Sequence, residues 1–360
     1  QKAISDKIKS IDENIKVHTK GMAYIQSKGR SNNRLELGFN HEEISKFVDI
    51  NGCDSWAYYG KETDTLQGKT MWYDYMTSVM EAPVSNSEDH ILTGSEMSRS
   101  DAELDYNMAD VWQGAVHGRG STALWLWDDT KKSVLGSNYY NSNLTRRVDY
   151  IAGIGKVALD LNRLAYEVTA IQEADARVGI LYSDSSLVLN PYSLQATYKV
   201  YEKAMAYGEK AFFVNESNPE ALCEQKLEIL IVPCCNYIKE ETLLEMKQFL
   251  DNGGRILLLN ANGKGYYDEN GNAHDSTLLN NVTSRSEKVS FYKGNGITIH
   301  DNWNTVSNKL KSVFSEFSHP VELVAANGAT EWLSAKYGGD YIINLCNYGD
   351  SDTQITLNTE

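Results

Sequence analysis

The sequence lacks long apolar runs, a cysteine framework and any concentration of positive charge. No window of its 360 residues approaches the roughly 18 uninterrupted apolar residues that a membrane-spanning helix needs. The formal net charge is −15, and this argues against a nucleic-acid partner, because phosphate binding needs clustered Lys and Arg. What remains is a globular chain whose charge fits a neutral ligand.

The five cysteines match no known pattern of metal ligands or disulfides. Their number is odd, and Cys234 and Cys235 are adjacent at the end of an apolar run, where we interpret them as packing residues. We therefore predict no metal and no cofactor. Without a disulfide framework, a cytoplasmic location is favoured over a periplasmic or secreted one. The 22 Tyr and 7 Trp are more informative, because sugar rings stack on aromatic faces.

The length predicts two or three domains. Up to residue 175, short apolar runs alternate with helical patterns, which is typical of repeated βα units. The expected helices cover 71–81, 109–117 and a long segment over 146–168. The expected strands lie within 16–24, 47–59, 90–97 and 121–127.

A second unit is predicted over 176–317. Its fully apolar strands at 177–183, 211–215, 228–233 and 255–260 alternate with helices, which indicates a parallel, doubly wound sheet covered on both faces. After about residue 318 the pattern changes to alternating residues with Gly-Gly and Tyr-Gly-Asp turns. Residues 318–360 are therefore expected to begin a small β-sandwich.

Four segments of the first unit, taken in order, resemble the second half of a catalytic (β/α)8 barrel of the family 42 β-galactosidases, which are bacterial glycoside hydrolases. The segments are IKVHTKGMAY (15–24), HEEISKFVDINGCDSWAYYG (41–60), HILTGSEMS (90–98) and VWQGAVHGRGSTALWLWDDT (111–130). The resemblance identifies their strands as the fifth to the eighth of a TIM barrel. It also implies that residues 176–317 form a flavodoxin-like domain that mediates homotrimerisation.

The resemblance implies that Glu96, at the end of the expected seventh strand, is the nucleophile of a retaining glycosidase. Barrel enzymes carry their chemistry at the carboxyl ends of the strands. A carboxylate that ends an apolar strand beside Gly94 and Ser95 is also costly unless its site uses the charge.

Five further residues are candidates for substrate binding. Trp125 and Trp127 lie two apart in one expected strand and so face the same side, with Trp127 nearer the barrel mouth as a floor for the sugar. Asp54 and Tyr58 share one side of the expected sixth strand, within 47–59. The Tyr58 phenol is expected to reach the nucleophile. Asp128 follows the eighth strand, where it would bind a sugar hydroxyl or cap a turn.

Retaining hydrolysis needs a second carboxyl group, which protonates the leaving group from about 5 Å away. In the related barrels this Glu follows an Asn at the end of the fourth strand, and no such pair precedes the expected fifth strand here. We expect this acid/base residue upstream of Gln1. We expect the first half of the barrel there as well, because half a barrel exposes two raw sheet edges.

Alternative functions remain open. The second unit also resembles class I glutamine amidotransferases, but Asn260 and Ala261 stand where that chemistry needs a cysteine. The sugar is not readable from the sequence, so cleavage of a β-mannoside, a β-glucuronide or an algal galactan stays possible. A non-catalytic carbohydrate-binding or oligomerisation protein is the alternative from another class.

Overall fold

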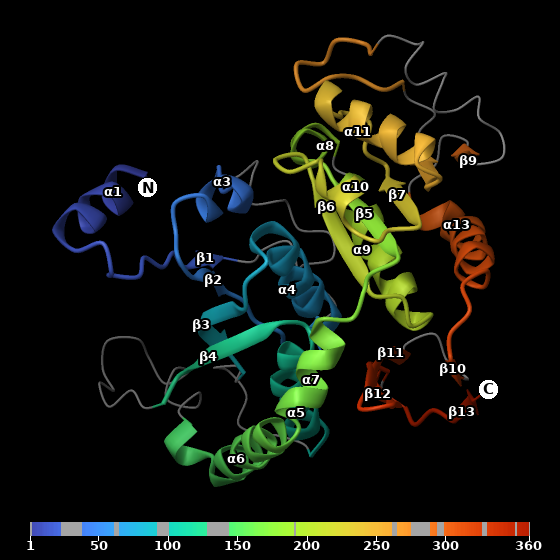
Figure 1. Cartoon of the computed structure of the whole chain (residues 1–360). Coiled ribbons are helices and arrows are strands. Elements are labelled where there is room, and N and C mark those ends of the chain that lie inside the picture. The colour runs from blue at the N-terminus through green and yellow to red at the C-terminus, as the bar shows by residue number, and fades with distance from the viewer. Residues whose placement is uncertain are drawn as a thin grey trace. The chain divides into compact units, whose positions relative to one another are not determined.

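The computed structural model describes residues 2–22, 38–60, 65–91, 101–127, 144–190, 192–260, 265–274, 289–293, 299–325, 330–349 and 351–359. Apart from Gly38, the described residues up to Glu173 form one compact unit. The residues from Ala174 onward form a second (Figure 1). Within the described part of the chain, none of the helices has the length and apolar character needed to cross a bilayer.

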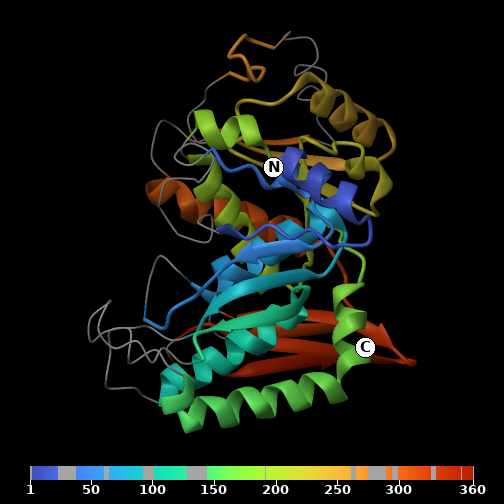
Figure 2. The same cartoon turned by 90° about the vertical axis from the view of Figure 1, so that its left-hand side faces the viewer.

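The first unit is built on a four-stranded parallel sheet. Its strands are hydrogen-bonded in the order in which they occur in the chain, as Figure 2 shows. Consecutive parallel neighbours connected by helices are the arrangement of a barrel segment, so the sheet is consistent with part of a TIM-barrel-like fold. The strands are β1 (Gly21–Met22), β2 (Asn51–Asp54), β3 (Val84–His90) and β4 (Arg119–Trp125).

Helices connect these strands and cover one face of the sheet. The Thr65 hydroxyl begins α4 by accepting a hydrogen bond from the Gly68 N–H, and Glu81 ends it in a left-handed conformation. Helix α4 contacts both β2 and β3, and apolar side chains are buried on both sides of this contact, such as Met71 and Met76 of the helix and Cys53 and Val84 of the sheet. The helices are α1 (Lys2–Ile11), α3 (His41–Ser45), α4 (Leu66–Met80), α5 (Asp101–Val116), the 3-10 helix η3 (Leu144–Arg146), α6 (Val148–Arg163) and α7 (Ala165–Gln172).

The position predicted for the third of these strands was wrong. The strand was expected at 90–97, whereas β3 ends at His90 and begins six residues earlier, at Val84. Its sequence, VSNSEDH, is mostly polar, and an apolar-run criterion therefore misses it. Strands β1 and β2 lie within their expected ranges, although β1 is only two residues long, and β4 overlaps its expected range but begins two residues before it.

The second unit contains a five-stranded parallel sheet in the order β6-β5-β7-β8-β9. This order, in which the first strand lies between the second and the third, occurs in flavodoxin-like doubly wound sheets. Its core joins Leu230, Val232 and Leu258 of the sheet to Leu243 and Phe249 of a covering helix. The strands are β5 (Val178–Tyr182), β6 (Ala211–Asn215), β7 (Ile229–Pro233), β8 (Arg255–Asn260) and β9 (Val289–Lys293), and the helices are α8 (Asp184–Leu189), α9 (Tyr192–Ala206), α10 (Ala221–Glu224), α11 (Glu240–Asp251) and α13 (Ile299–Phe314).

The C-terminal residues form two antiparallel pairs. Strand β10 (Val321–Ala325) pairs with β13 (Ile355–Thr359), and β11 (Thr330–Tyr337) pairs with β12 (Asp340–Asn347). These pairs belong to the same compact unit as the five-stranded sheet. The division into three domains, and the assignment of this part as the start of a β-sandwich, stay predictions.

Candidate functional site

Four polar side chains meet where β2 and β3 end, beside the residue that precedes β1. The Lys20 ammonium lies 3.3 Å from Asp54 Oδ2 and forms a second ion pair with Glu88 Oε2. The other Glu88 oxygen, Oε1, lies 2.9 Å from His90 Nε2. Because a carboxylate only accepts hydrogen bonds, Nε2 carries the proton of the imidazole. Both oxygens of Glu88 are thus held by different partners.

A β-bulge in β3 gives Glu88 its direction. Asn86 is opposite Thr122 of β4, but Asp89 is opposite Leu124, so β3 contains one extra residue between them. The bulge breaks the alternation of the strand. Asn86 and Asp89 therefore both contact α4, while Glu88 and His90 belong to the cluster on the other side.

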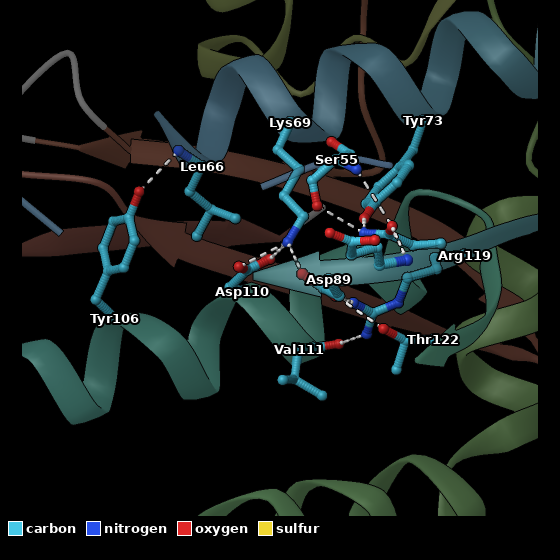
Figure 3. Close-up of polar contacts among 12 residues, drawn as sticks. Ser55, Leu66, Lys69, Tyr73, Asp89, Tyr106, Asp110, Val111, Arg119 and Thr122 are labelled. Atoms are coloured by element: carbon cyan, nitrogen blue, oxygen red, sulfur yellow. Dashed lines mark hydrogen bonds and ion pairs between the residues drawn. The ribbon is translucent and has the colours of Figure 1, made fainter. Parts of the chain in front are cut away.

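On the helix side, a buried charge network fixes the same stretch of strand (Figure 3). Asp89 lies 2.6 Å from the Lys69 ammonium and 2.9 Å from Arg119 Nη1, and it accepts a hydrogen bond from the Thr122 hydroxyl. Lys69 also pairs with Asp110 at 2.8 Å. Two cations and two carboxylates balance, which is the condition under which charges can be buried at moderate cost.

The network shifts the pKa values of its two carboxyl groups in opposite directions. Burial alone would raise the pKa of Asp89, but Lys69 and Arg119 outweigh it and hold that pKa below its usual value. For Asp110 burial prevails over Lys69, and the pKa is raised. Asp89 is therefore the firmly ionised member, and it lies directly beside Glu88 in the chain.

Aromatic side chains surround His90. Trp125 of β4 is the direct cross-strand partner of His90, and the two rings stack at a centroid distance of 5.6 Å. Trp56 approaches the same imidazole edge-on at 6.0 Å. Burial lowers the pKa of His90 despite the neighbouring carboxylates Asp54 and Asp89, so the ring is neutral at pH 7.

Asp54, Glu88 and His90 also have donor atoms within 4.8 Å of one another, a geometry that a metal ion could use. The Lys20 ammonium, however, already pairs with both carboxylates of this group. A divalent ion would have to displace or repel this cation. We therefore assign the cluster as an ion-pair network rather than a metal centre.

The structure brings two of the six predicted site residues to this cluster. Asp54 is part of it, and Trp125 contacts it through His90. Tyr58 is half-buried, and 62% of Trp127 is exposed. Strand β4 ends at Trp125, so the predicted alternation does not extend to Trp127. Glu96 and Asp128 lie outside the described residues.

Sequence reasoning missed Glu88, His90 and Lys20. One local signal could have found the first two. Pro83 lies three residues after the last residue of α4, which marks a new element at Val84 and places Glu88 near its carboxyl end. Lys20 gives no comparable signal, because its partners come from other strands.

In the second unit, described residues that follow β5 and β7 are hydrogen-bonded to one another at the edge where doubly wound sheets bind ligands. The loops after β5 and β7 are joined there, because Ser183 and Ser186 both donate to the Tyr237 carbonyl at 2.6 Å. Cys234 and Cys235 are buried, and burial raises the pKa of the Cys235 thiol to about 12. The Cys235 thiol therefore does not have the features of an amidotransferase nucleophile.

The fold matches solved glycoside hydrolases along almost the whole chain. An exo-carrageenase of family GH42 from Bacteroides ovatus superimposes with a TM-score of 0.74 at 19% identity, covering 99% of this chain and 49% of that one. The chain has the fold of the family 42 glycoside hydrolases. A GH42 β-galactosidase from G. stearothermophilus gives a TM-score of 0.69 at 11% identity over 97% of this chain and 60% of that one.

A third structure, a β-galactosidase from the psychrophilic Marinomonas ef1, gives a TM-score of 0.65 at 11% identity, covering 100% of this chain and 66% of that chain. The chain thus spans about half the length of the exo-carrageenase and about two thirds or less of the β-galactosidases. No protein-family model matches the sequence, and no curated protein matches it. The likeness is therefore one of fold.

Proposed function

We propose that this chain carries the nucleophile half of the active site of a retaining glycoside hydrolase that cleaves a terminal β-glycoside. The observation that carries the proposal is the Glu88 carboxylate, which ends a barrel strand in a family 42 fold with both oxygens held by Lys20 and His90. Active sites of such barrels lie at the carboxyl ends of the strands.

In this mechanism Glu88 attacks the anomeric carbon as the bond to the leaving oxygen breaks, and that oxygen takes its proton from the acid/base residue. Water then releases the sugar with retained configuration. Glu96, the nucleophile predicted from the sequence, remains the alternative, since it follows β3 by only six residues. The experiment below distinguishes the two.

Asp54 does not fit the role of the acid/base. Its carboxylate shares the Lys20 ammonium with Glu88 and is held in that ion pair. We propose instead that Asp54 holds a sugar hydroxyl. Its Oδ1 is buried and makes no hydrogen bond to any residue that the structure describes, and a hydroxyl would satisfy it. The acid/base is proposed to lie upstream of Gln1.

A β-galactoside is the substrate that we propose, because two of the three similar structures are β-galactosidases. The third, an exo-carrageenase, keeps an algal galactan open as the alternative, and a β-mannoside or β-glucuronide also remains possible. The net negative charge of the cluster favours a neutral sugar at this position, since one lysine faces two carboxylates.

The test is covalent labelling of the full-length enzyme with a 2-deoxy-2-fluoro β-galactoside, followed by peptide mass spectrometry. We expect the sugar on Glu88, and we expect Glu88→Gln to reduce kcat by at least about a thousand-fold while the melting temperature is kept. Glu96→Gln is the matched comparison. A label on Glu96, together with an active Glu88→Gln variant, would identify Glu96 as the nucleophile instead. If neither residue is labelled and both variants stay active, neither is the nucleophile, and if the unaltered full-length enzyme cleaves no β-glycoside, the glycosidase proposal fails.

For the second unit we propose a structural role in a homotrimer. Support comes from the sheet order, from the closed loops at its ligand-binding edge and from the buried cysteines. A non-catalytic carbohydrate-binding protein is the competing function for the whole chain. The Glu88 carboxylate near the carboxyl end of β3, with each oxygen held by a different partner, favours the enzyme.

A further inference from the structure

We propose that Lys20 is a positioning residue for the nucleophile: its ammonium clamps Glu88 and Asp54 together, which keeps Glu88 ionised and fixes its attacking oxygen. This inference rests on the proposed function, in which Glu88 is the nucleophile. It adds a residue from the segment that leads into β1, which neither the sequence patterns nor the similar structures assign.

The geometry supports a specific clamp rather than a surface ion pair. Lys20 reaches across two strands, from the residue before β1 to Asp54 at the end of β2 and Glu88 near the end of β3. The Asp54 side chain is only 6% exposed and that of Glu88 20%, whereas that of Lys20 is 40% exposed. The more exposed lysine thus pairs with two less exposed carboxylates, which would repel each other without it.

Every charged group that faces Glu88 among the described residues belongs to this arrangement. Lys20 approaches Oε2, His90 holds Oε1 as a neutral donor, and Asp54 lies beyond the ammonium. From β4 the cluster meets the uncharged Trp125, through His90. Asp89 points away to Lys69 and Arg119, which neutralise it. Lys20 is therefore the cation that offsets the repulsion from Asp54.

The consequence is a change in the ionisation of the nucleophile. Removing the ammonium leaves Asp54 and Glu88 as neighbouring like charges, so protonation of Glu88 becomes easier and its pKa rises. The acid limb of the pH profile of kcat/KM reports that ionisation in the free enzyme. A cation within about 4–6 Å shifts a carboxyl pKa by about 1–3 units, and partial exposure places Lys20 at the lower end.

The experiment compares Lys20→Met, which keeps the chain length, with Lys20→Arg, which keeps the charge, in the full-length enzyme. Lys46→Met is the matched control, because Lys46 also pairs with a glutamate, Glu43, at 2.7 Å but on the surface. The rate is measured from pH 4 to pH 8, taken as about the titration range of a carboxyl and an imidazole, on the para-nitrophenyl β-glycoside that the unaltered enzyme cleaves fastest. Lys20→Gln repeats the test should Lys20→Met melt early.

We expect the acid limb of Lys20→Met to move up by about one pH unit, which is about a ten-fold loss of kcat/KM below the original limb. Lys20→Arg and Lys46→Met should keep the original limb. The clamp proposal is overturned if the acid limb of Lys20→Met stays where it is in the unaltered enzyme. It is also overturned if Lys20→Met and Lys20→Arg shift that limb equally. Labelling of Glu88 in the unaltered enzyme separates this failure from that of the proposed function, because it tests the nucleophile without using Lys20.

Discussion

His90 connects the charged part of the site to its aromatic part. Its Nε2 donates to Glu88, while its ring lies on the face of Trp125. Because burial keeps the imidazole neutral, it orients Glu88 without adding a charge to the cluster. The same stacking covers part of Trp125, of which 38% is exposed, whereas Trp127 is 62% exposed. The more open indole is thus the one with a free face for a ligand.

We predict that Trp127 contributes to the sugar platform. Trp127→Ala should weaken binding of a monosaccharide inhibitor by up to about 3 kcal/mol, the scale of lost stacking and burial. Tyr166→Ala is the control, because Tyr166 is a 77% exposed aromatic residue on α7. Inhibition constants measured on folded variants decide the question. Equal constants for Trp127→Ala and the unaltered enzyme would place Trp127 on the outer surface.

At the scale of elements, β3 shows why a polar strand can lie in the middle of a sheet. Its helix-facing side meets Lys69 and Arg119 instead of apolar residues, and its other side carries the catalytic candidates. Both cations come from neighbouring elements, α4 and β4. The bulge and the charge network together fix which residues of β3 face which side. The network therefore links the packing of the helices to the direction of Glu88.

Lys69→Met should strongly destabilise the first unit. Removing the buried ammonium leaves Asp89 and Asp110 close together with only Arg119 to balance them, so the free energy of unfolding should fall by about 3–5 kcal/mol. Urea unfolding followed by tryptophan fluorescence measures this change. Lys46→Met, which removes an exposed ion pair, should change it by at most about 1 kcal/mol. Equal midpoints for both variants would show that the buried network is not stabilising.

The elements differ in how well their sequences predict them. The four expected strands of the second unit agree with β5 to β8 within a residue or so, because strands buried on both faces are fully apolar. The search for apolar runs missed strand β3, because its polar residues are paired with charged residues from distant positions in the sequence, such as Lys69. Glu88 was missed for this reason. Lys20 could be assigned only once the sheet order was known.

At the scale of the molecule, we propose different roles for the two compact units, catalysis for the first and oligomerisation for the second. The first contains the cluster around Glu88, and the second has a doubly wound sheet whose ligand-binding edge is closed by Ser183, Ser186 and Tyr237. The sheet of the second unit buries a large apolar core around Leu230 and Leu258. The oligomerising role proposed for this unit is tested by the mass of the assembly.

The homotrimer is the last prediction. Multi-angle light scattering of the full-length protein at micromolar concentration should give three times the mass of one chain. The same experiment on the Cys234→Ala, Cys235→Ala double variant should give the same mass, because both thiols are buried packing groups and the Cys235 thiol, with its raised pKa, does not ionise near pH 7. Closed symmetric assemblies keep their stoichiometry on dilution until they dissociate, so a dilution series checks that the mass is not a mixture. A strict monomer throughout the series would remove the oligomerising role from the second unit and leave its function open.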